Sequence, residues 1–590
     1  MTFWEEFFRV LCWRPFQALA GLYWHLTRRK VRARNRMRLG ATQAPHAYYY
    51  WTEKIEDNVG LAARAPAIVQ EWHFKPKFSI LLQISAAAAD DWVERTIESA
   101  KKQFYTEWEL IITAPRDDVM RPQSGDDSRV IFLPTPVHEA EMLTAGLNAA
   151  TGDYVVPVSV GQILSESALF RFGEALQAKQ RPSIIYGDQD EIDVRGHRSR
   201  PWFKPQWDEE MFFAQDYLSD ACAVDLSLAK DVSPTEMLSG EAAIFTLLLS
   251  VSRAATSQIV HVPHILCHVS AEMNRSNQPA RVSAVANHLK PLGSKSEPGP
   301  FDTVKVDWPL PQDPPKVCIV IPTRDKVNLL RACVSSVLGS TNYPNFEILI
   351  IDNGSSEPEA LSYLTQLDKD PLVRVKSYDH PYNFSAINNF AAELASAPYL
   401  CLLNNDTEVI AQDWLLEMMR YAVRPEVGAV GAKLLYEDGS IQHAGVVVGI
   451  CEAAGHAHRF TRSGDPGYFG QPHLTHVVSA VTAACLVVEK KKFVAVGGFD
   501  AERLQVAFND VDLCLKLQKA GWRNVYVPHA VLLHHESKSR GLDSSPKQVS
   551  RYMRELAVLQ GRWGTKFYRD PRLNPNLSRY SETFILRMEA

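Results

Sequence analysis

One stretch decides the fold of this chain: Leu400-Cys401-Leu402-Leu403-Asn404-Asn405-Asp406-Thr407-Glu408-Val409. Its first four residues are apolar and predict the end of a buried strand, and two amides and a carboxylate follow directly. In an open α/β sheet, ligands bind at the carboxyl ends of the strands. The oxygen atoms of Asn404, Asn405 and Asp406 suit Mg²⁺ or Mn²⁺, which in turn bind a diphosphate. Taken alone, the same residues could instead form a turn and a helix cap.

The composition is that of a soluble globular protein, with 590 residues, 46% hydrophobic and 22% charged, and predicts two or three domains. The net charge of −5 argues against nucleic acid as a partner. The nine cysteines show no Cys-x-x-Cys pair and no metal-ligand spacing, which indicates reduced core residues of a cytosolic protein. No uncharged apolar run reaches about 18 residues, so no membrane-spanning helix is predicted.

Residues 1–70 are read as an amphipathic and basic N-terminal segment. Aromatic and apolar residues recur at helical spacing from Phe3 to Leu11, Pro15 ends this helix, and a second amphipathic stretch follows. The run 28–38 is strongly basic and comes after the apolar part, which is the reverse of a signal peptide. Two interpretations remain open: an in-plane anchor on anionic lipid, or helices packed on their own domain with a solvated basic face.

Two segments, 71–290 and 316–540, alternate strand and helix patterns, which predicts parallel sheets with right-handed crossovers. Between them, residues 291–315 contain seven prolines and are predicted to be a linker without regular structure. Residues 541–590 are predicted to begin with a helix and to end in a tail that wraps a domain surface.

Polar residues follow the predicted strands of the second segment where each strand ends. Ile321-Pro322-Thr323-Arg324 ends the first strand, and Ile351-Asp352-Asn353-Gly354-Ser355 ends the second. Asp352 could accept hydrogen bonds from a base or a ribose hydroxyl, or it could cap a turn. The residues from Asn383 to Asn389 open a helix whose amides could line the same mouth.

Three further groups complete the pattern. Phe508-Asn509-Asp510-Val511-Asp512 starts a helix with carboxylates in its first turn, where the helix dipole also favours them as caps. Gly497-Gly498-Phe499-Asp500 is a tight turn, and a strand that runs into His534-His535-Glu536 could hold functional or structural histidines. The spacing of His443, His456, His458, His473 and His476 fits no standard zinc site, so a polar acceptor loop is the preferred interpretation.

In this order the motifs resemble those of family-2 glycosyltransferases of the GT-A fold, in particular rhamnosyltransferase-like enzymes that build O-antigen or other surface polysaccharides. The resemblance covers most of 316–580 and rests on these stretches: 321–324, 351–355, 403–406, 442–445, 497–500, 508–512 and 534–541. It implies an α/β chain with two tandem GT-A domains, which are Rossmann-like nucleotide-diphospho-sugar transferase folds.

The resemblance also implies a role for each matching residue. Asp352 would contact a uracil or thymine nucleoside, Asp406 and His534 would bind the metal, and Asp510 would be the catalytic base. The other residues expected around the donor are Pro322, Thr323, Arg324, Asn383, Asn388, Asn404 and Asn405, and those expected on the acceptor side are His443, Gly498, Phe499, Asp500 and Asp512. Asn404 stands where the family has its first acid, so the protein is expected to hold the metal more weakly.

The first segment resembles the same family in the stretches 103–105, 108–110, 148–154 and 201–205, but it has lost the residues for chemistry. Val158-Ser159-Val160-Gly161-Gln162 stands at the metal motif, and the expected base region around Glu241 lacks a second acid. Acids survive at 188–193 without catalytic partners. We expect this segment to be a degenerate GT-A-like domain that is structural or binds the acceptor.

The sequence therefore predicts an inverting, metal-dependent glycosyltransferase of the hexosyltransferase class. It would move a sugar such as rhamnose from a UDP- or dTDP-linked donor to a surface polysaccharide or lipid-linked glycan. A leaving diphosphate needs the charge of Mg²⁺ or Mn²⁺, and the attacking hydroxyl needs one base, so a single displacement is expected. The expected location is cytoplasmic and peripheral, on the inner face of a bacterial plasma membrane with anionic lipid.

Two other functions stay open. A nucleotidyltransferase would need a Gly-rich phosphate loop with a lysine after the first strand, and Thr323-Arg324-Asp325 is not such a loop. A non-catalytic glycan-binding scaffold would hold glycan without divalent ion or nucleotide.

Overall fold

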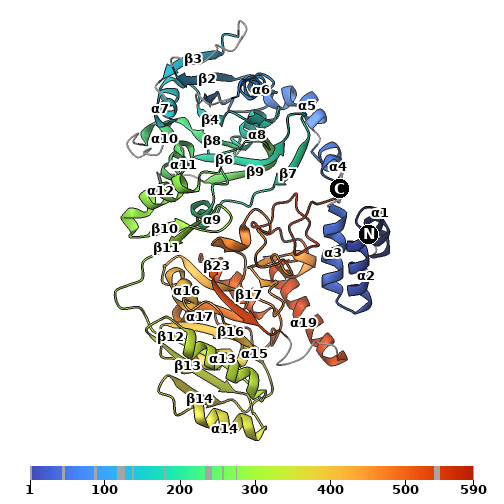
Figure 1. The fold of residues 1–590 in the computed structure, drawn as a ribbon, viewed down its shortest axis with the longest axis vertical. Coiled ribbons are helices and arrows are strands. Elements are labelled where there is room, and N and C mark those ends of the chain that lie inside the picture. Colours follow the sequence, from blue (N-terminus) through green and yellow to red (C-terminus); the bar gives the residue numbers. More distant parts are fainter. Residues whose placement is uncertain are drawn as a thin grey trace.

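The computed structural model describes residues 3–42, 47–56, 58–84, 89–115, 127–135, 139–178, 181–232, 242–254, 258–273, 276–536 and 545–588. They form two α/β domains that follow one another along the long axis of the molecule, with the N-terminal helices on one flank (Figure 1). The predicted pair of tandem α/β domains is confirmed.

The N-terminal segment is helical throughout its described part, with α1 (Phe3–Trp13), α2 (Pro15–Leu26), α3 (Lys30–Thr42), α4 (Ala47–Lys54) and α5 (Asn58–Gln70). Pro15 occupies the first turn of α2, where its missing N–H costs no helical hydrogen bond. Helices α1, α2 and α3 pack against one another around Phe7, Val10, Ala18 and Met37. Every helix in the described ranges is too short or too polar to cross a bilayer.

The first domain is a mixed sheet flanked by helices. Its elements are β1 (Phe78–Gln83), α6 (Asp90–Lys101), β2 (Trp108–Pro115), β3 (Val130–Thr135), α7 (Glu139–Ala149), β4 (Tyr154–Ser159), β5 (Gln162–Leu164), α8 (Ala168–Ala175), β6 (Ile184–Ile192), β7 (Arg198–Trp202), α9 (Glu209–Ala214), β8 (Cys222–Asp225), α10 (Leu226–Asp231), α11 (Ala243–Ala254), β9 (Ile259–Ser270) and α12 (Gln278–Leu289). The strand order is β3-β2-β1-β4-β8-β6-β9-β5.

The second domain repeats this plan. Its elements are β12 (Val317–Thr323), α13 (Val327–Ser340), β13 (Phe346–Asp352), α14 (Pro358–Leu367), β14 (Val373–Ser377), α15 (Phe384–Leu394), β15 (Tyr399–Leu403), β16 (Thr407–Val409), α16 (Trp414–Ala422), β17 (Val427–Leu435), β18 (Ile441–His443), β19 (Val446–Val448), β20 (Ala454–His456), β21 (His476–Val478), β22 (Cys485–Glu489), α17 (Lys490–Ala495), α18 (Asn509–Lys519), β23 (Arg523–His534) and, after it, α19 (Pro546–Trp563). The strand order is β14-β13-β12-β15-β22-β17-β23-β16.

The two sheets match strand for strand. Strands β1, β2 and β4 run parallel, as β12, β13 and β15 do, and β8 and β22 are the antiparallel strands that follow. At the far edge, β5 lies antiparallel to β9 and β16 lies antiparallel to β23. This correspondence gives each residue at a strand end of the second domain a counterpart in the first.

The prediction of an irregular linker is wrong between Lys295 and Asp307. There the chain forms an antiparallel hairpin of β10 (Lys295–Pro298) and β11 (Val304–Asp307). Pro298 is the last residue of its strand, a position that tolerates a missing N–H. Val304, Val306 and Trp308 are buried, so every second residue of this stretch is an inward-facing apolar side chain, as in a strand. The prolines on either side obscured this pattern in the sequence.

The C-terminal tail joins the two domains. A capping box between Ser545 and Gln548 starts α19. Further on, Asp570 accepts hydrogen bonds from the second-domain Val448 N–H, and Asn574 donates to Asp188 of the first domain. The tail therefore fixes the domains to each other rather than covering only one of them.

Candidate active site

A cavity of about 700 Å³ opens at the carboxyl ends of β12, β13 and β15. Parallel strands end at the same edge of a sheet, which is where α/β folds bind ligands. Eight of the residues predicted from the sequence line it: Pro322, Thr323, Arg324, Asn404, Asn405, Asp406, Asp510 and His534. The lining also includes Asp325, Lys326, Asn353, Glu357, Tyr382, Asn509 and Glu536.

The Asn404-Asn405-Asp406 turn joins the end of β15 to the start of β16. Asn405 Nδ2 donates to Thr323 Oγ1 over 3.0 Å, which ties the end of β15 to the end of β12. Thr407, the first residue of β16, lies opposite His534 on β23. This pairing brings Asp406 Oδ1 to 3.2 Å from His534 Nε2, and both side chains are buried.

The tautomer of His534 follows from its other nitrogen. Nδ1 lies 2.8 Å from Gln442 Oε1, which can only accept, so Nδ1 is the donor and a neutral ring would present its Nε2 lone pair toward Asp406. Two ligands of one octahedral Mg²⁺ lie about 3 Å apart. The carboxylate and imidazole therefore fit a divalent ion, although the described residues contain no group of three or more His, Cys, Asp or Glu that could hold one.

The neighbouring His535 has a different environment. Its Nε2 lies 2.7 Å from Glu408 Oε1, and its Nδ1 contacts Glu437, so both ring nitrogens face carboxylates outside the cavity lining. Of the two adjacent histidines, His534 is the one placed beside Asp406.

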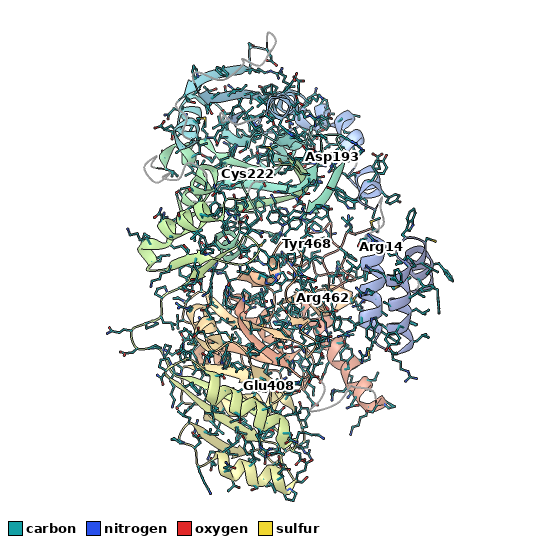
Figure 2. The ribbon with its side chains drawn as sticks, in the orientation of Figure 1. Arg14, Asp193, Cys222, Glu408, Arg462 and Tyr468 are labelled. Carbon is teal, nitrogen blue, oxygen red and sulfur yellow. The ribbon has the colours of Figure 1, made fainter. Side chains whose placement is uncertain are left out.

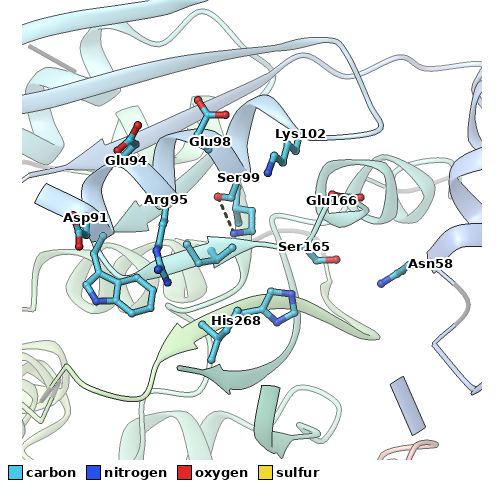
Figure 3. Close-up of a pocket in the computed structure, with 14 residues that line it drawn as sticks. Asn58, Asp91, Glu94, Arg95, Glu98, Ser99, Lys102, Ser165, Glu166 and His268 are labelled. Atoms are coloured by element: carbon cyan, nitrogen blue, oxygen red, sulfur yellow. Dashed lines mark hydrogen bonds between the residues drawn. The ribbon is translucent and has the colours of Figure 1, made fainter. Parts of the chain in front are cut away.

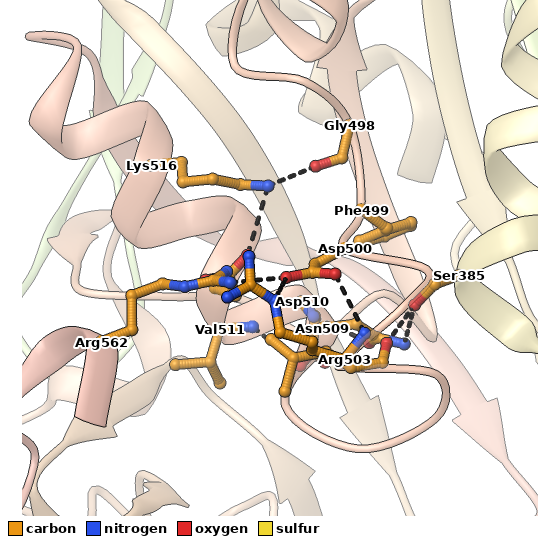
Figure 4. A network of polar contacts seen from close by, with 12 residues as sticks. Ser385, Gly498, Phe499, Asp500, Arg503, Asn509, Asp510, Val511, Lys516 and Arg562 are labelled. Carbon is orange, nitrogen blue, oxygen red and sulfur yellow. Dashed lines mark hydrogen bonds and ion pairs between the residues drawn. The ribbon is translucent and has the colours of Figure 1, made fainter. Parts of the chain in front are cut away.

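Asp510 lies in the first turn of α18 (Figure 4) and is among the residues that line the same cavity. Its Oδ1 accepts from the Val511 N–H over 2.8 Å and its Oδ2 accepts from the Ala483 N–H over 3.2 Å. Burial raises the pKa of the carboxyl, even though these hydrogen bonds lower it. A raised pKa makes Asp510 a better proton acceptor than an ordinary aspartate.

The residues expected on the acceptor side do not line this cavity. Asp512 is fully buried and pairs with Arg562 Nη1 over 2.7 Å and Lys516 Nζ over 3.2 Å. Asp500 also pairs with Arg562, so these carboxylates connect α18 and its preceding loop to α19 (Figure 4). Gly498 accepts from Lys516 through its carbonyl, and Phe499 is buried in the core.

The predicted acceptor loop of histidines is wrong, because its members are largely buried. His443 is fully buried, with Nδ1 2.9 Å from His456 Nδ1, and its pKa is well below the usual value because of burial and the neighbouring histidines. His458, His473 and His476 are buried as well. His443 thus lies behind the Gln442–His534 pair rather than on an acceptor surface.

Three residues expected around the donor lie beside the cavity rather than in its lining. Asp352 Oδ1 accepts from the Ser355 N–H and hydroxyl, so it caps the turn after β13. Asn383 caps α15, and Asn388 is fully buried, donating to the Phe384 carbonyl within that helix. Short polar side chains at turns and helix starts find backbone partners locally, which explains the difference.

Several residues that line the cavity were not predicted from the sequence to do so. Asp325 and Lys326 both adopt positive φ near 50°, and Asp325 Oδ1 accepts from the Ser356 and Glu357 N–H groups. Glu536 receives a hydrogen bond from the Tyr436 hydroxyl over 2.8 Å and pairs with Arg459. Glu536 and Asp325 stand next to motif residues but were given no role, and the three-dimensional turn geometry places them at the cavity together with Lys326.

The first domain has no carboxylate–imidazole pair at the positions that match Asp406 and His534. Gly161 directly precedes β5, as Asp406 directly precedes β16, and Val269 lies opposite the first residue of β5, as His534 does for β16. The second residue of α11 is Ile244, whereas that of α18 is Asp510. Glu241, considered above as a base, lies outside the described residues.

The first domain nevertheless has a cavity of about 770 Å³, located between α6, β5 and β9 (Figure 3). Arg95 reaches across to the Val194 carbonyl, and His268 Nδ1 contacts Asp190 over 2.5 Å. The acids at 188–193 have structural partners: Asp188 faces His261 and Asn574, and Asp190 also pairs with Arg198. Its one imidazole among the described lining residues, His268, pairs with Asp190, which is also held by Arg198 and Tyr48, and neither residue stands at the positions that match Asp406 and His534.

Residues 318–489 match the Glycosyl transferase family 2 description. The chain is 37% identical over 549 residues to uncharacterized protein y4gI of Sinorhizobium fredii, in an alignment that covers 89% of this chain and 60% of the relative. It is 35% identical over 546 residues to O-antigen biosynthesis protein RfbC of Myxococcus xanthus, in an alignment that covers 88% of this chain and 42% of the relative. It thus spans about half the length of these relatives. Over 85 residues, which are 14% of this chain and 27% of the relative, it is 40% identical to an N-acetylglucosaminyl-diphospho-decaprenol L-rhamnosyltransferase of Mycobacterium tuberculosis. A GalNAc-T7 crystal structure with UDP, GalNAc and Mn²⁺ overlaps 44% of this chain and 50% of that one, at 17% identity and a TM-score of 0.34.

Proposed function

We propose that this chain, which carries a glycosyl transferase family 2 domain, moves a sugar from a nucleotide-diphospho donor to a hydroxyl of a glycan or lipid-linked glycan. One observation carries the proposal: Asp406 Oδ1 and His534 Nε2 face each other over 3.2 Å in a cavity that Asp510 also lines. This arrangement supports a transferase over a simple glycan groove, because a glycan groove would not need a buried carboxylate–imidazole pair and a second carboxylate in one cavity.

Asp406 and His534 are the proposed ligands of Mg²⁺ or Mn²⁺, with the donor diphosphate completing the coordination. When bound, such an ion neutralises the charge of the leaving diphosphate. Arg324 and Lys326 are exposed at the same mouth and would add positive charge beside the phosphates. Thr323 and Asn405 hold the two strand ends together, so they would position the donor rather than react with it.

The nucleoside is proposed to be uridine or thymidine, bound at the end of β13 where Asn353 lines the cavity and Asp352 shapes the turn. L-Rhamnose is the proposed sugar, because the chain aligns at 40% identity with a relative named as a rhamnosyltransferase. The name of the Myxococcus relative points to a surface polysaccharide as the product.

Asp510 is the proposed base. It would take the proton of the acceptor hydroxyl while that oxygen forms a bond to the anomeric carbon. At the same time the bond from this carbon to the diphosphate oxygen breaks, and the nucleoside diphosphate leaves. One base and one displacement give inversion at the anomeric carbon. We further propose that the protein works at the inner face of a bacterial plasma membrane, held there peripherally, with no nucleic-acid partner.

A donor screen tests this function. The full chain is incubated with UDP- and dTDP-linked sugars and Mn²⁺, and release of nucleoside diphosphate is measured with and without EDTA. We expect one donor class to be turned over, EDTA to stop it, and added Mg²⁺ or Mn²⁺ to restore it. Undiminished turnover in EDTA would overturn the metal assignment, and glycan binding without any donor turnover would favour the scaffold.

A further inference from the structure

The N-terminal helices present a large apolar surface, here called the aromatic face. It consists of the exposed large apolar side chains of α1 and α2: Trp4, Phe8, Trp13, Phe16, Leu19, Tyr23 and Leu26. On α2 they recur every three or four residues and so form one stripe. Phe16 is 87% exposed and Leu26 is 71% exposed, so the chain itself leaves this stripe uncovered.

The bundle does not need this face for its own folding. Its interior is built from other residues, and α3 packs closely on both neighbours: a Cβ at Gly21 would lie 2.5 Å from Met37 Sδ, and one at Gly40 would lie 2.6 Å from Val10. Side chains of the bundle project from the flank of the molecule away from the two sheets (Figure 2). Large apolar side chains exposed in a stripe along a helix, as on α2, mark an interaction site.

The charges around the face identify its partner. From Phe7 to Thr52 the chain has no acidic residue, whereas residues 1–52 hold nine basic ones: Arg9, Arg14, Arg28, Arg29, Lys30, Arg32, Arg34, Arg36 and Arg38. Arg28, Arg29 and Lys30 are exposed and follow Leu26, the end of the apolar stripe, after a single residue, Thr27. The rest of the chain is acidic enough to bring the net charge to −5.

We propose that the aromatic face docks on the surface of an anionic lipid bilayer. Amphipathic helices with aromatic side chains on one face and cations at its edge bind in the interface plane, with the rings among the acyl chains and the cations at the headgroups. A second copy of the chain is disfavoured as the occupant, because the basic edges of two such faces would repel each other.

A set of contacts connects the bundle to the rim of the catalytic cavity. The Arg32 guanidinium on α3 lies 4.2 Å from the centre of the Phe460 ring and 3.5 Å from Asp438 Oδ2. Its neighbour Tyr436 donates to Glu536, which lines the cavity next to His534. Docking would therefore hold the cavity close to the bilayer, which suits a lipid-linked acceptor. This last step rests on the proposed transferase function, whereas the docking itself does not.

The native chain offers a probe for the docking. Cys12 on α1 is exposed, whereas the other cysteines are buried or half-buried. An environment-sensitive dye on Cys12 should shift to the blue when vesicles of phosphatidylglycerol and phosphatidylcholine are added, and the protein should float with them. Vesicles of phosphatidylcholine alone, or high salt, should weaken both signals because exposed charges are screened.

Matched variants test whether vesicle binding depends on the aromatic face itself or on any exposed apolar side chain. Phe16→Ser with Leu19→Ser should lower vesicle partitioning about tenfold or more, because two apolar side chains lose their burial in lipid. Phe567→Ser is the control: it is 85% exposed but lies outside the bundle, and should leave partitioning unchanged. Equal flotation of all variants, or a concentration-dependent dimer that protects Cys12 without lipid, would overturn the proposal. Donor hydrolysis in solution should be the same for the native chain, the double variant and the Phe567→Ser control. A failed flotation would therefore count against the docking alone, whereas a failed donor screen would count against the proposed transferase function.

Discussion

The two domains have the same strand order and strand directions, yet only the second has a carboxylate and an imidazole, Asp406 and His534, at the positions that we propose to hold the metal. At the end of β15 and at the facing end of β23, the second domain has Asp406 and His534, whereas the first has Gly161 and Val269 at the matching positions. The same sheet can therefore be built with different residues at its strand ends, because its core is formed by the buried strands themselves.

The acids that remain in the first domain have acquired structural contacts. Asp188 accepts hydrogen bonds from the Lys204 N–H and from Asn574 of the C-terminal tail. Asp190 faces His268 and the Tyr48 hydroxyl, which links β6 to α4. A carboxylate at a strand end can therefore connect parts of the chain instead of taking part in catalysis. Which of the two roles it has depends on the side chains that contact it.

The largest effect should come from removing the metal carboxylate. Asp406→Ala should lower turnover by about 10⁴-fold or more, because a bound ion contributes several kcal/mol of charge stabilisation. Excess Mn²⁺ should not rescue it. Steady-state release of nucleoside diphosphate measures the effect, and recovery of activity at millimolar Mn²⁺ would assign the metal to other residues.

Next in size is the loss of the base. Asp510→Asn keeps the shape of the side chain but cannot take a proton, so turnover should fall by roughly 10²–10⁴-fold. Nucleotide affinity, measured by calorimetry, should change little. A normal rate in this variant, combined with a loss of rate on changing Asp188, would place the chemistry in the first domain.

The pH dependence of turnover is a further test of Asp510 in the second domain as the base. Burial raises the pKa of Asp510, and only its carboxylate form can act as the base, so the rate should fall about tenfold per pH unit below that pKa. This acid limb should lie above the ordinary aspartate pKa of about 4. A profile of kcat/KM against pH tests it, and persistence of the same limb in Asp510→Asn would show that another group is titrating.

The smallest effect on turnover should come from the first domain. Asp188→Asn removes a charged acceptor from a buried cluster, so the free energy of unfolding should drop by about 1–3 kcal/mol while turnover stays within a few-fold. Thermal unfolding together with the donor assay separates the two quantities. A large loss of turnover with no loss of stability would contradict a purely structural role.

Much of the fold and about half of the site followed from the sequence. Asp406, Asp510 and His534 were recognisable because each stands in a motif at a strand or helix end. Asp352 and Asn388, expected around the donor, and Asp512, expected on the acceptor side, do not line the cavity, because a motif does not tell whether a polar side chain is used by a local turn or a buried ion pair. Glu536 and Lys326 line the cavity next to motif residues, but a motif does not tell which of its neighbours face the cavity.

The most direct test of a single catalytic sheet is a Mn²⁺ titration followed by electron paramagnetic resonance, with nucleoside diphosphate present. One Mn²⁺ should bind per chain, His534→Ala and Asp406→Ala should each abolish the site, and Val269→Ala in the first domain should leave it intact. Two sites per chain, or a site that survives both second-domain substitutions, would contradict the account.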